Sequence, residues 1–410
     1  MIASVTIRNF RALRNASLSL LPFNLVIGPN GSGKTSLILA LQRLRSLARL
    51  PLRNPPHREA DERIADAPSA GLAACATWPP HKEADGRVAD GRIADGHIAD
   101  GPEISWHFTP PFDGVMAVMR CVSETECDFL DVVPLPSGAG RGDWPKLRVA
   151  LAGIRCYVLD HRALASRSLS REGAELKGDG ANLATVLAAL QLHAPGAFDE
   201  LREALCRILP EYDDLQWAFA NDGTVELQLR LADSGGLVAA EHLSQGTLYL
   251  LGLLALAYDP TPPPVVCIEE IDRGFHPRLL RDVRDVLYRL SYPEASGLKR
   301  APVQVIATTH SPFMLDLFGE HPEEVVLAEK HGEAAQFSRL SDRKDLTDVL
   351  DGGGLGDMWY AGILGGVPQE CATQESAPPF ETDKTDRSDQ SDQTDQPDQS
   401  DERGEADNLP

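Results

Sequence analysis

The sequence predicts an α/β fold with a central, mostly parallel sheet flanked by helices. Three times, a short apolar strand ends in polar residues and a helix pattern follows, at Phe23–Ile27, Val265–Glu270 and Val303–Thr308. Parallel sheets are built from strands and helices that alternate in this way. Other strand patterns follow one another without an intervening helix, which predicts an added antiparallel β subdomain. Two consecutive helix patterns predict a helical subdomain.

The N-terminal third supplies the antiparallel strands and the first helix. Residues 2–8 and 16–21 read as two strands joined by a turn, and Ser36–Ala48 reads as a helix with one apolar face. The other strand patterns of this region lie at Ile104–Phe108, Val115–Cys121, Asp128–Val133, Leu147–Val149 and Cys156–Asp160.

The helical subdomain is expected at Leu183–Leu192 and Phe198–Leu209, and strands follow at 215–219, 224–231 and 236–240. An apolar helix over Leu248–Ala257 precedes the second strand–helix unit. The remaining elements are expected as helices at 278–290, 313–318, 344–350 and 355–363 and as strands at 325–328 and 335–340.

A glycine-rich segment joins the first parallel strand to the first helix. Gly28–Thr35 fits the pattern G-x-x-x-x-G-K-[ST], in which backbone N–H groups surround the phosphates of a nucleotide at a helix N-terminus. Lys34 is expected to reach the β- and γ-phosphates, and the Thr35 hydroxyl to ligate Mg²⁺. The sequence therefore predicts a nucleoside triphosphate site. Its expected contacts are Gly28, Pro29, Asn30, Gly31, Ser32, Gly33, Lys34, Thr35 and Ser36.

Composition narrows the class of protein further. The net charge of −22 argues against a general nucleic-acid coat protein, although residues 1–55 hold eight Arg or Lys and no acid. The basic first helix therefore either faces nucleic acid or is a solvated face, and the second is the commoner case. Seven scattered cysteines without a C-x-x-C pair suit free thiols in a reducing compartment. Without a signal peptide or a long apolar run, the chain is expected to be cytoplasmic, with no membrane partner.

Two segments are unlike the rest of the chain. Residues 54–103 contain a five-residue repeat with too few apolar residues to form a core, so we expect a disordered insertion. Residues 368–410 are rich in Ser, Asp, Gln and Thr and read as a disordered acidic tail. The predicted folded part of the chain therefore consists of 1–53 and 104–367.

Acidic and histidine side chains follow two of the apolar strands. Glu269 and Glu270 end one strand, and His310 ends the next. In a parallel sheet these ends meet at one edge, where ligands bind. Glu269 is expected to hold Mg²⁺, Glu270 to orient and deprotonate the attacking water, and His310 to bind the γ-phosphate or that water.

A third polar segment precedes the apolar helix. Ser244-Gln245-Gly246 offers a hydroxyl, a flexible backbone and a helix N-terminus, all of which suit an anion. A plain helix cap uses the same residue types, so chemistry alone leaves both interpretations open.

With these motifs in place, the chain resembles ABC-type ATPase heads, and within them the RecF-like and structural-maintenance-of-chromosomes-like group of small AAA-class "predicted ATPases". Leu243–Thr247 resembles the signature loop, Cys267–Pro277 the Walker B strand with its following turn, and Thr308–Pro312 the switch-histidine loop. Ile7–Arg11 resembles the family's first strand. Glu269 stands where the family usually has Asp, and neither a coiled-coil arm nor a Toprim nuclease domain is found.

The resemblance implies a head-to-tail dimer that sandwiches ATP. The phosphate loop, Lys34, Glu269, Glu270 and His310 would come from one subunit, and Ser244 and Gly246 from the other. It implies a Mg²⁺-dependent ATPase that acts on DNA or on a separately encoded effector, such as a component of a defence system. The alternative is a regulatory ATP-binding scaffold with little turnover. A nuclease is disfavoured because the Toprim acids are missing, and a GTPase because no Asn-Lys-x-Asp motif occurs.

Overall fold

The computed structural model describes residues 1–49, 101–121, 127–135, 144–170, 175–332, 334–347 and 353–365. Contacts divide the chain into the compact units 1–368 and 369–410, and all described residues lie in the first. The expected acidic tail and all of the expected insertion except its last three residues lie outside the described residues, as does the end of the helix expected at 344–350.

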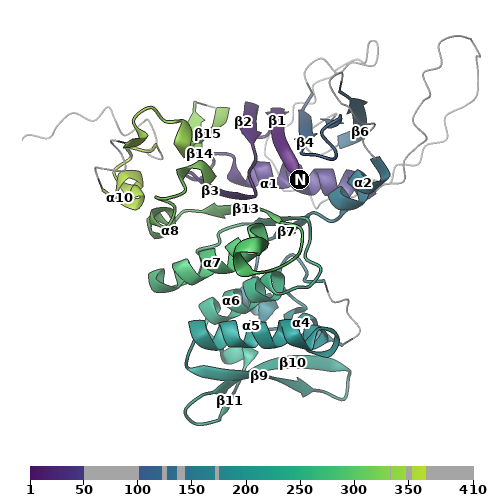
Figure 1. Cartoon of the computed structure of the whole chain (residues 1–410), viewed down its shortest axis with the longest axis vertical. Coiled ribbons are helices and arrows are strands. Elements are labelled where there is room, and N and C mark those ends of the chain that lie inside the picture. The colour runs from purple at the N-terminus through teal and green to yellow at the C-terminus, as the bar shows by residue number, and fades with distance from the viewer. Residues whose placement is uncertain are drawn as a thin grey trace, which may run out of the picture. The chain divides into compact units, whose positions relative to one another are not determined.

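The central sheet has six strands in the order β15-β14-β3-β13-β12-β7 (Figure 1). All neighbours pair in parallel except β14 and β15, which pair antiparallel. The predicted fold class is therefore confirmed. The strands are β3 (Phe23–Ile27), β7 (Arg155–Tyr157), β12 (Val265–Ile268), β13 (Gln304–Thr309), β14 (Val325–His331) and β15 (Ala334–Arg339).

Successive residues of the central strands face two different hydrophobic cores. Val26 and Ile306 lie in the core that contains helix α1 (Lys34–Arg49), whereas Leu25 and Val305 lie in the core that contains α6 (Gln245–Ala257). Side chains of a strand alternate between the two faces, so a sheet covered on both sides needs nearly continuous apolar strands. This explains why β3 is buried at every position.

The predicted antiparallel subdomain is a second sheet with the strand order β2-β1-β4-β5-β6. Its apolar face packs against α1 in the core that contains Val26 and Ile306, and Trp106 is fully buried there. The strands are β1 (Ile2–Phe10), β2 (Leu13–Ser19), β4 (Glu103–Phe108), β5 (Val115–Cys121) and β6 (Cys127–Pro134).

The helical subdomain lies on the opposite side of the central sheet, where α4, α5 and α6 pack beside a small third sheet (Figure 1). The helices of the described part are α1, α2 (Trp144–Ala152), α3 (His161–Leu164), α4 (Leu183–His193), α5 (Pro195–Ile208), α6, α7 (Leu280–Ser291), α8 (Pro312–Asp316) and α10 (Leu355–Tyr360). The third sheet contains β8 (Ser168–Leu169), β9 (Tyr212–Phe219), β10 (Thr224–Leu231) and β11 (Leu237–Ala239).

Two expectations are wrong. The strand expected at Leu147–Val149 is part of helix α2, because Leu147 and Leu151, four residues apart, form one buried helical face and Val149 is exposed. The expectation of free thiols fails at Cys121, which is disulfide-bonded, whereas Cys156, Cys206 and Cys267 are free. Cys121 lies opposite Cys127 in the register of β5 and β6. The spacing of the two cysteines in the sequence does not predict that they are paired across two strands.

Candidate functional site

The loop Gly28–Thr35, here called the glycine loop, connects β3 to α1 as predicted. Gly31 and Gly33 have φ values of 77° and 94°, in the left-handed region that favours glycine. Gly28 packs so closely on β14 that a Cβ atom would lie 2.3 Å from the carbonyl oxygen of Ala328. These three positions therefore need glycine for backbone reasons, whatever the loop binds.

Lys34 closes the glycine loop from inside. Its Nζ donates hydrogen bonds to the carbonyl oxygens of Gly28, at 2.7 Å, and Pro29, at 2.9 Å. Burial lowers the pKa of Lys34 to about 8, although the charges of Glu269 and Glu270 oppose that shift. A buried cation held by two neutral carbonyls is well placed to exchange them for phosphate oxygens.

A second donor in the glycine loop also suits a phosphate. Ser32 is buried, and its hydroxyl has no hydrogen-bond partner within the described part of the chain. A buried hydroxyl without a partner costs free energy, on the order of 1–3 kcal/mol, that a bound acceptor would recover. The loop's own residues therefore fit a triphosphate.

The two predicted metal ligands meet across 234 residues of sequence. The Thr35 hydroxyl donates a hydrogen bond to Glu269 Oε2 at 3.0 Å. Burial raises the pKa of Glu269, as does the charge of Glu270, while Thr35 and Lys34 act in the opposite direction. Among the described residues no group of three or more His, Cys, Asp or Glu side chains forms a metal site. Thr35 and Glu269 would hold Mg²⁺, whose other ligands would be water and phosphate oxygens.

Glu270 follows directly and has an unusual backbone. Its φ of 52° lies in the left-handed region, which costs a residue with a side chain about 1–2 kcal/mol. Its N–H donates to the Thr308 hydroxyl at 3.0 Å, and its exposed carboxylate lies 3.9 Å from Arg273. Such strain persists where surrounding contacts impose it, and it is frequent at functional sites.

His310 lies at the same sheet edge, directly after β13 and exposed. Burial of part of the ring lowers the pKa of His310, and so does the charge of Lys34, whereas Asp272 and Glu270 act to raise it. The charges of Lys34 and Glu270 therefore both act on His310, and the lowered pKa favours the neutral imidazole.

Ser244 and Gly246 lie elsewhere, at the start of α6. Ser244 is the N-cap, and its Oγ accepts a hydrogen bond from the N–H of Thr247 at 3.1 Å. Gly246 packs so tightly on the following turn that a Cβ atom would lie 2.8 Å from the carbonyl oxygen of Gly274. Throughout the described part, no hydrogen bond joins these two residues to the glycine loop. The structure thus brings the other predicted site residues together, but not these two.

Sequence reasoning missed the polar contacts that support the acids. Thr309 donates to Asp272, Thr308 accepts from Glu270, and the N–H of Glu269 donates to the carbonyl oxygen of Tyr157. Two threonines at the end of an otherwise apolar strand are the signal that points to the first two contacts.

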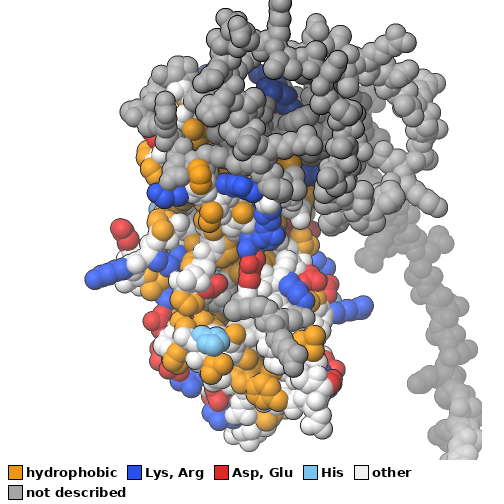
Figure 2. All heavy atoms as spheres, turned by 90° about the vertical axis from the view of Figure 1, so that its right-hand side faces the viewer, with side chains coloured by type: hydrophobic (Ala, Val, Ile, Leu, Met, Phe, Trp, Pro, Cys, Tyr) orange, Lys and Arg blue, Asp and Glu red, His pale blue; other side chains and the backbone are white. Residues whose placement is uncertain are grey.

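The basic residues around the end of α1 have structural partners. Arg148 donates to the carbonyl oxygen of Ala48 at 2.7 Å, and Arg155 donates to that of Ala152 at 3.0 Å. Arg155 also pairs with Glu175, as does Arg45 at 3.9 Å. Figure 2 shows Lys and Arg side chains gathered with hydrophobic ones on one face of the molecule. The arginines named here cap helix ends or share a carboxylate, so they do not by themselves indicate nucleic acid.

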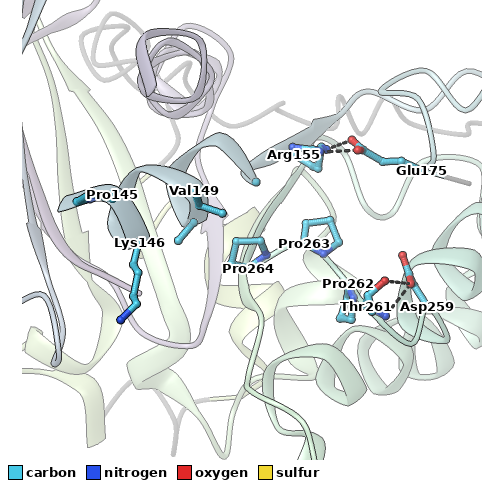
Figure 3. A pocket seen from close by; sticks show the side chains of 12 residues that line it. Pro145, Lys146, Val149, Arg155, Glu175, Asp259, Thr261, Pro262, Pro263 and Pro264 are labelled. Carbon is cyan, nitrogen blue, oxygen red and sulfur yellow. Dashed lines mark hydrogen bonds and ion pairs between the residues drawn. The ribbon is translucent and has the colours of Figure 1, made fainter. Parts of the chain in front are cut away.

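A cavity of about 830 Å³ lies between α2 and the segment Thr261–Pro264 (Figure 3). None of the predicted site residues lines it. Its polar groups bond to one another, with Arg155 paired to Glu175 and Thr261 donating to Asp259 at 2.8 Å. Prolines and the exposed Val149 form much of the remaining wall. Arg155, Glu175 and Asp259 are thus engaged within the lining, and the cavity shares no residue with the predicted site.

Two family models match the segments that carry these residues. Residues 1–65 match "AAA ATPase domain", and residues 176–316 match "AAA domain, putative AbiEii toxin, Type IV TA system". The first includes the glycine loop, and the second includes Ser244, Glu269, Glu270 and His310. The predicted resemblance to AAA-class ATPases is confirmed, and nucleotide binding and hydrolysis are supported at that general level.

Two solved structures are similar to much of this chain at low sequence identity. One is a structure titled as the SmcHead bound to the C-winged helix domain of ScpA, with 14% identity, a TM-score of 0.48 and coverage of 84% of this chain and 99% of that one. Another is the SMC head domain from Thermotoga maritima, with 13% identity, a TM-score of 0.40 and coverage of 82% and 98%. No curated protein matches the sequence. No helix in the described part is both long and apolar enough for a membrane span.

Proposed function

We propose that this chain is a Mg²⁺-dependent ATPase head that dimerises on ATP and hydrolyses it at two composite sites. The observation that carries the proposal is the hydrogen bond of 3.0 Å between Thr35 and Glu269. It joins the glycine loop to the acidic strand end, and Glu270 is the next residue. A metal bound by both residues would lie beside the phosphates and the catalytic carboxylate.

The residues that one chain contributes to the site, here called the cis half-site, each have a distinct task. Lys34 exchanges the carbonyl oxygens of Gly28 and Pro29 for phosphate oxygens, and the N–H groups of the glycine loop surround the β-phosphate. Thr35 and Glu269 hold Mg²⁺, which when bound neutralises charge on the phosphate oxygens. Glu270 orients the attacking water and accepts its proton. His310 donates an N–H to the γ-phosphate or holds the water.

The part of the site that a second copy would contribute, here called the trans half-site, is the start of its helix α6. Ser244 is exposed there, and the helix N-terminus carries a partial positive charge. Bound to a γ-phosphate on another subunit, these groups would bridge the two copies, and hydrolysis would remove the bridge. ATP then acts as an association switch whose cycle drives a partner.

The partner is proposed to be DNA or a separately encoded effector of a defence system. Support for the second comes from the description of the family that matches residues 176–316, which names a toxin and a toxin–antitoxin system. A pull-down of the Glu270→Gln protein with ATP, scored for protein and nucleic acid together, identifies the partner.

The decisive experiment is kinetic. Glu270→Gln keeps the shape of the side chain but removes the base, so turnover should fall about 10²- to 10⁴-fold while ATP binding persists. Size-exclusion chromatography with light scattering should show that this variant accumulates as a dimer with Mg²⁺-ATP. Wild-type turnover in the variant would remove Glu270 from its proposed role.

The alternative is an ATP-binding scaffold with little turnover. The ion pair of 3.9 Å between Glu270 and Arg273 favours it, because a carboxylate that contacts Arg273 is less free to bind the attacking water. Steady-state turnover with and without DNA separates the two proposals, since a scaffold should have a negligible rate under both conditions.

A further inference from the structure

Two buried threonines connect the strand that ends in His310 to the turn that contains Glu270. Thr308 is 2% exposed and Thr309 is 0% exposed, in a strand whose other residues are apolar apart from Gln304. Buried hydroxyls persist where they form hydrogen bonds, so their partners indicate their purpose.

The hydroxyl bonds of these two threonines reach the acidic turn or the histidine loop. The Thr308 hydroxyl accepts from the N–H of Glu270 at 3.0 Å, and its carbonyl oxygen accepts from the N–H of Ile271 at 3.0 Å. The Thr309 hydroxyl donates to Asp272 Oδ1 at 2.5 Å and accepts from the N–H of Ser311 at 3.0 Å. Thr308 and Thr309, which precede His310, are thereby tied to the residues on both sides of Ile271.

We infer that Thr308, Thr309 and Asp272 are positioning residues that hold Glu270 and His310 in a fixed relative geometry for attack on the γ-phosphate. The inference rests on the proposed function, in which Glu270 and His310 act on the same water and phosphate. None of the three needs to touch the nucleotide.

The backbone of Glu270 shows why these positioning hydrogen bonds are needed. With a φ of 52° the residue is strained, and a turn free to relax would leave that region and carry the carboxylate away. The bond from its own N–H to Thr308 holds the strained peptide, and the bond between Thr309 and Asp272 holds the other end of the turn. Positional errors near 1 Å at a reacting centre cost about 100-fold in rate.

Two substitutions of Thr309 separate positioning from packing. Thr309→Val keeps the shape of the side chain but removes the hydroxyl, whereas Thr309→Ser keeps the hydroxyl but removes a methyl group. Positioning predicts that Thr309→Val lowers kcat about 10- to 100-fold with KM unchanged, and that Thr309→Ser keeps kcat near the wild-type value. A purely structural role in the core predicts the reverse order.

A matched control exists outside the site. The Thr224 hydroxyl donates to Asp222 Oδ1 at 2.7 Å, a bond of the same type at the start of β10. Thr224→Val should therefore leave kcat unchanged. Asp272 is only half-buried, so Asp272→Ala should fold even if Thr309→Val does not, and it tests the same hydrogen bond. Asp272→Ala should lower kcat as much as Thr309→Val, and the double variant should be no slower than either.

The assay is phosphate release at saturating ATP and Mg²⁺, with Glu270→Gln measured alongside. If Glu270→Gln lacks turnover but Thr309→Val and Asp272→Ala match the wild type, this inference fails and the proposed function stands. If Glu270→Gln itself turns over normally, the proposed function fails first. Equal damage from Thr309→Ser and Thr309→Val, or from Thr224→Val, also overturns the inference.

Discussion

The glycine-loop edge and the start of α6 carry predicted site residues of the same ATPase, yet the fold treats them differently. At the edge, Thr35 contacts Glu269 across 234 residues of sequence. The charge of Glu270 acts to raise the pKa of Lys34, and the charge of Lys34 acts to lower the pKa of His310. At the start of α6, the Ser244 hydroxyl is engaged by its own helix. One half of the proposed site is assembled within the chain, and the other half presents an exposed group that needs a second surface.

The largest expected effect comes from two variants, one that impairs the cis half-site and one that impairs the trans half-site, tested alone and mixed. Lys34→Ala removes the cis cation. Ser244→Asp preserves a helix cap but places a negative charge against the γ-phosphate, so each variant alone should lose at least about 100-fold in turnover. Mixed one to one, half of the dimers would contain one intact site, which restores about a quarter of the wild-type rate. Phosphate release from titrated mixtures measures the recovery.

The control mixture combines Lys34→Ala with Glu270→Gln. Both defects lie in the cis half, so every site in a mixed dimer carries one of them and no recovery should occur. Recovery in this control, or none with Ser244→Asp, would show that the two regions do not form one site across subunits.

A smaller effect is expected on the affinity of the cis half-site for ATP when the pH is raised. The pKa of Lys34 is about 8 before nucleotide binds, and phosphate charges raise it in the complex, so the protonated lysine is the binding form. The affinity for ATP should therefore be constant below pH 8 and fall above it, by up to about tenfold per pH unit. Equilibrium binding of a fluorescent ATP analogue from pH 7 to 9.5 measures this.

Lys34→Arg is the matched variant for the pH experiment, since the guanidinium stays charged over that range. Its affinity should be independent of pH even if it is weaker. A wild-type profile that is equally flat would contradict the role of Lys34 as the titrating group.

The smallest effect concerns Ser244 in the free monomer. Ser244→Ala removes the N-cap of α6 and should lower the free energy of unfolding by about 1 kcal/mol. Ser244→Asp retains a cap and should be close to wild type. Urea denaturation of both variants without nucleotide measures the difference, and equal stability of all three proteins would show that the hydroxyl has no role in the monomer.

Sequence patterns predicted most of the fold because they are local. The limits of β3 and β5 match the predicted strands, since continuous or alternating apolar residues are visible without tertiary context. The pattern failed at Leu147–Val149, where three residues fit a strand or a helix equally well and only the burial of Leu147 with Leu151 decides. The short α3 and β8 were missed because elements of so few residues carry no period.

The residues of the predicted site were nameable from sequence, since the glycine pattern, the paired acids and the strand-end histidine each have a chemistry of their own. Tertiary structure alone decided which of them meet. The parallel order β3-β13-β12 brings Thr35, Glu269 and His310 to one edge, and it positions Thr308 and Thr309 against the strained turn at Glu270. Periodicity and residue type act over a few positions, whereas strand order results from the packing of two cores that no local pattern contains.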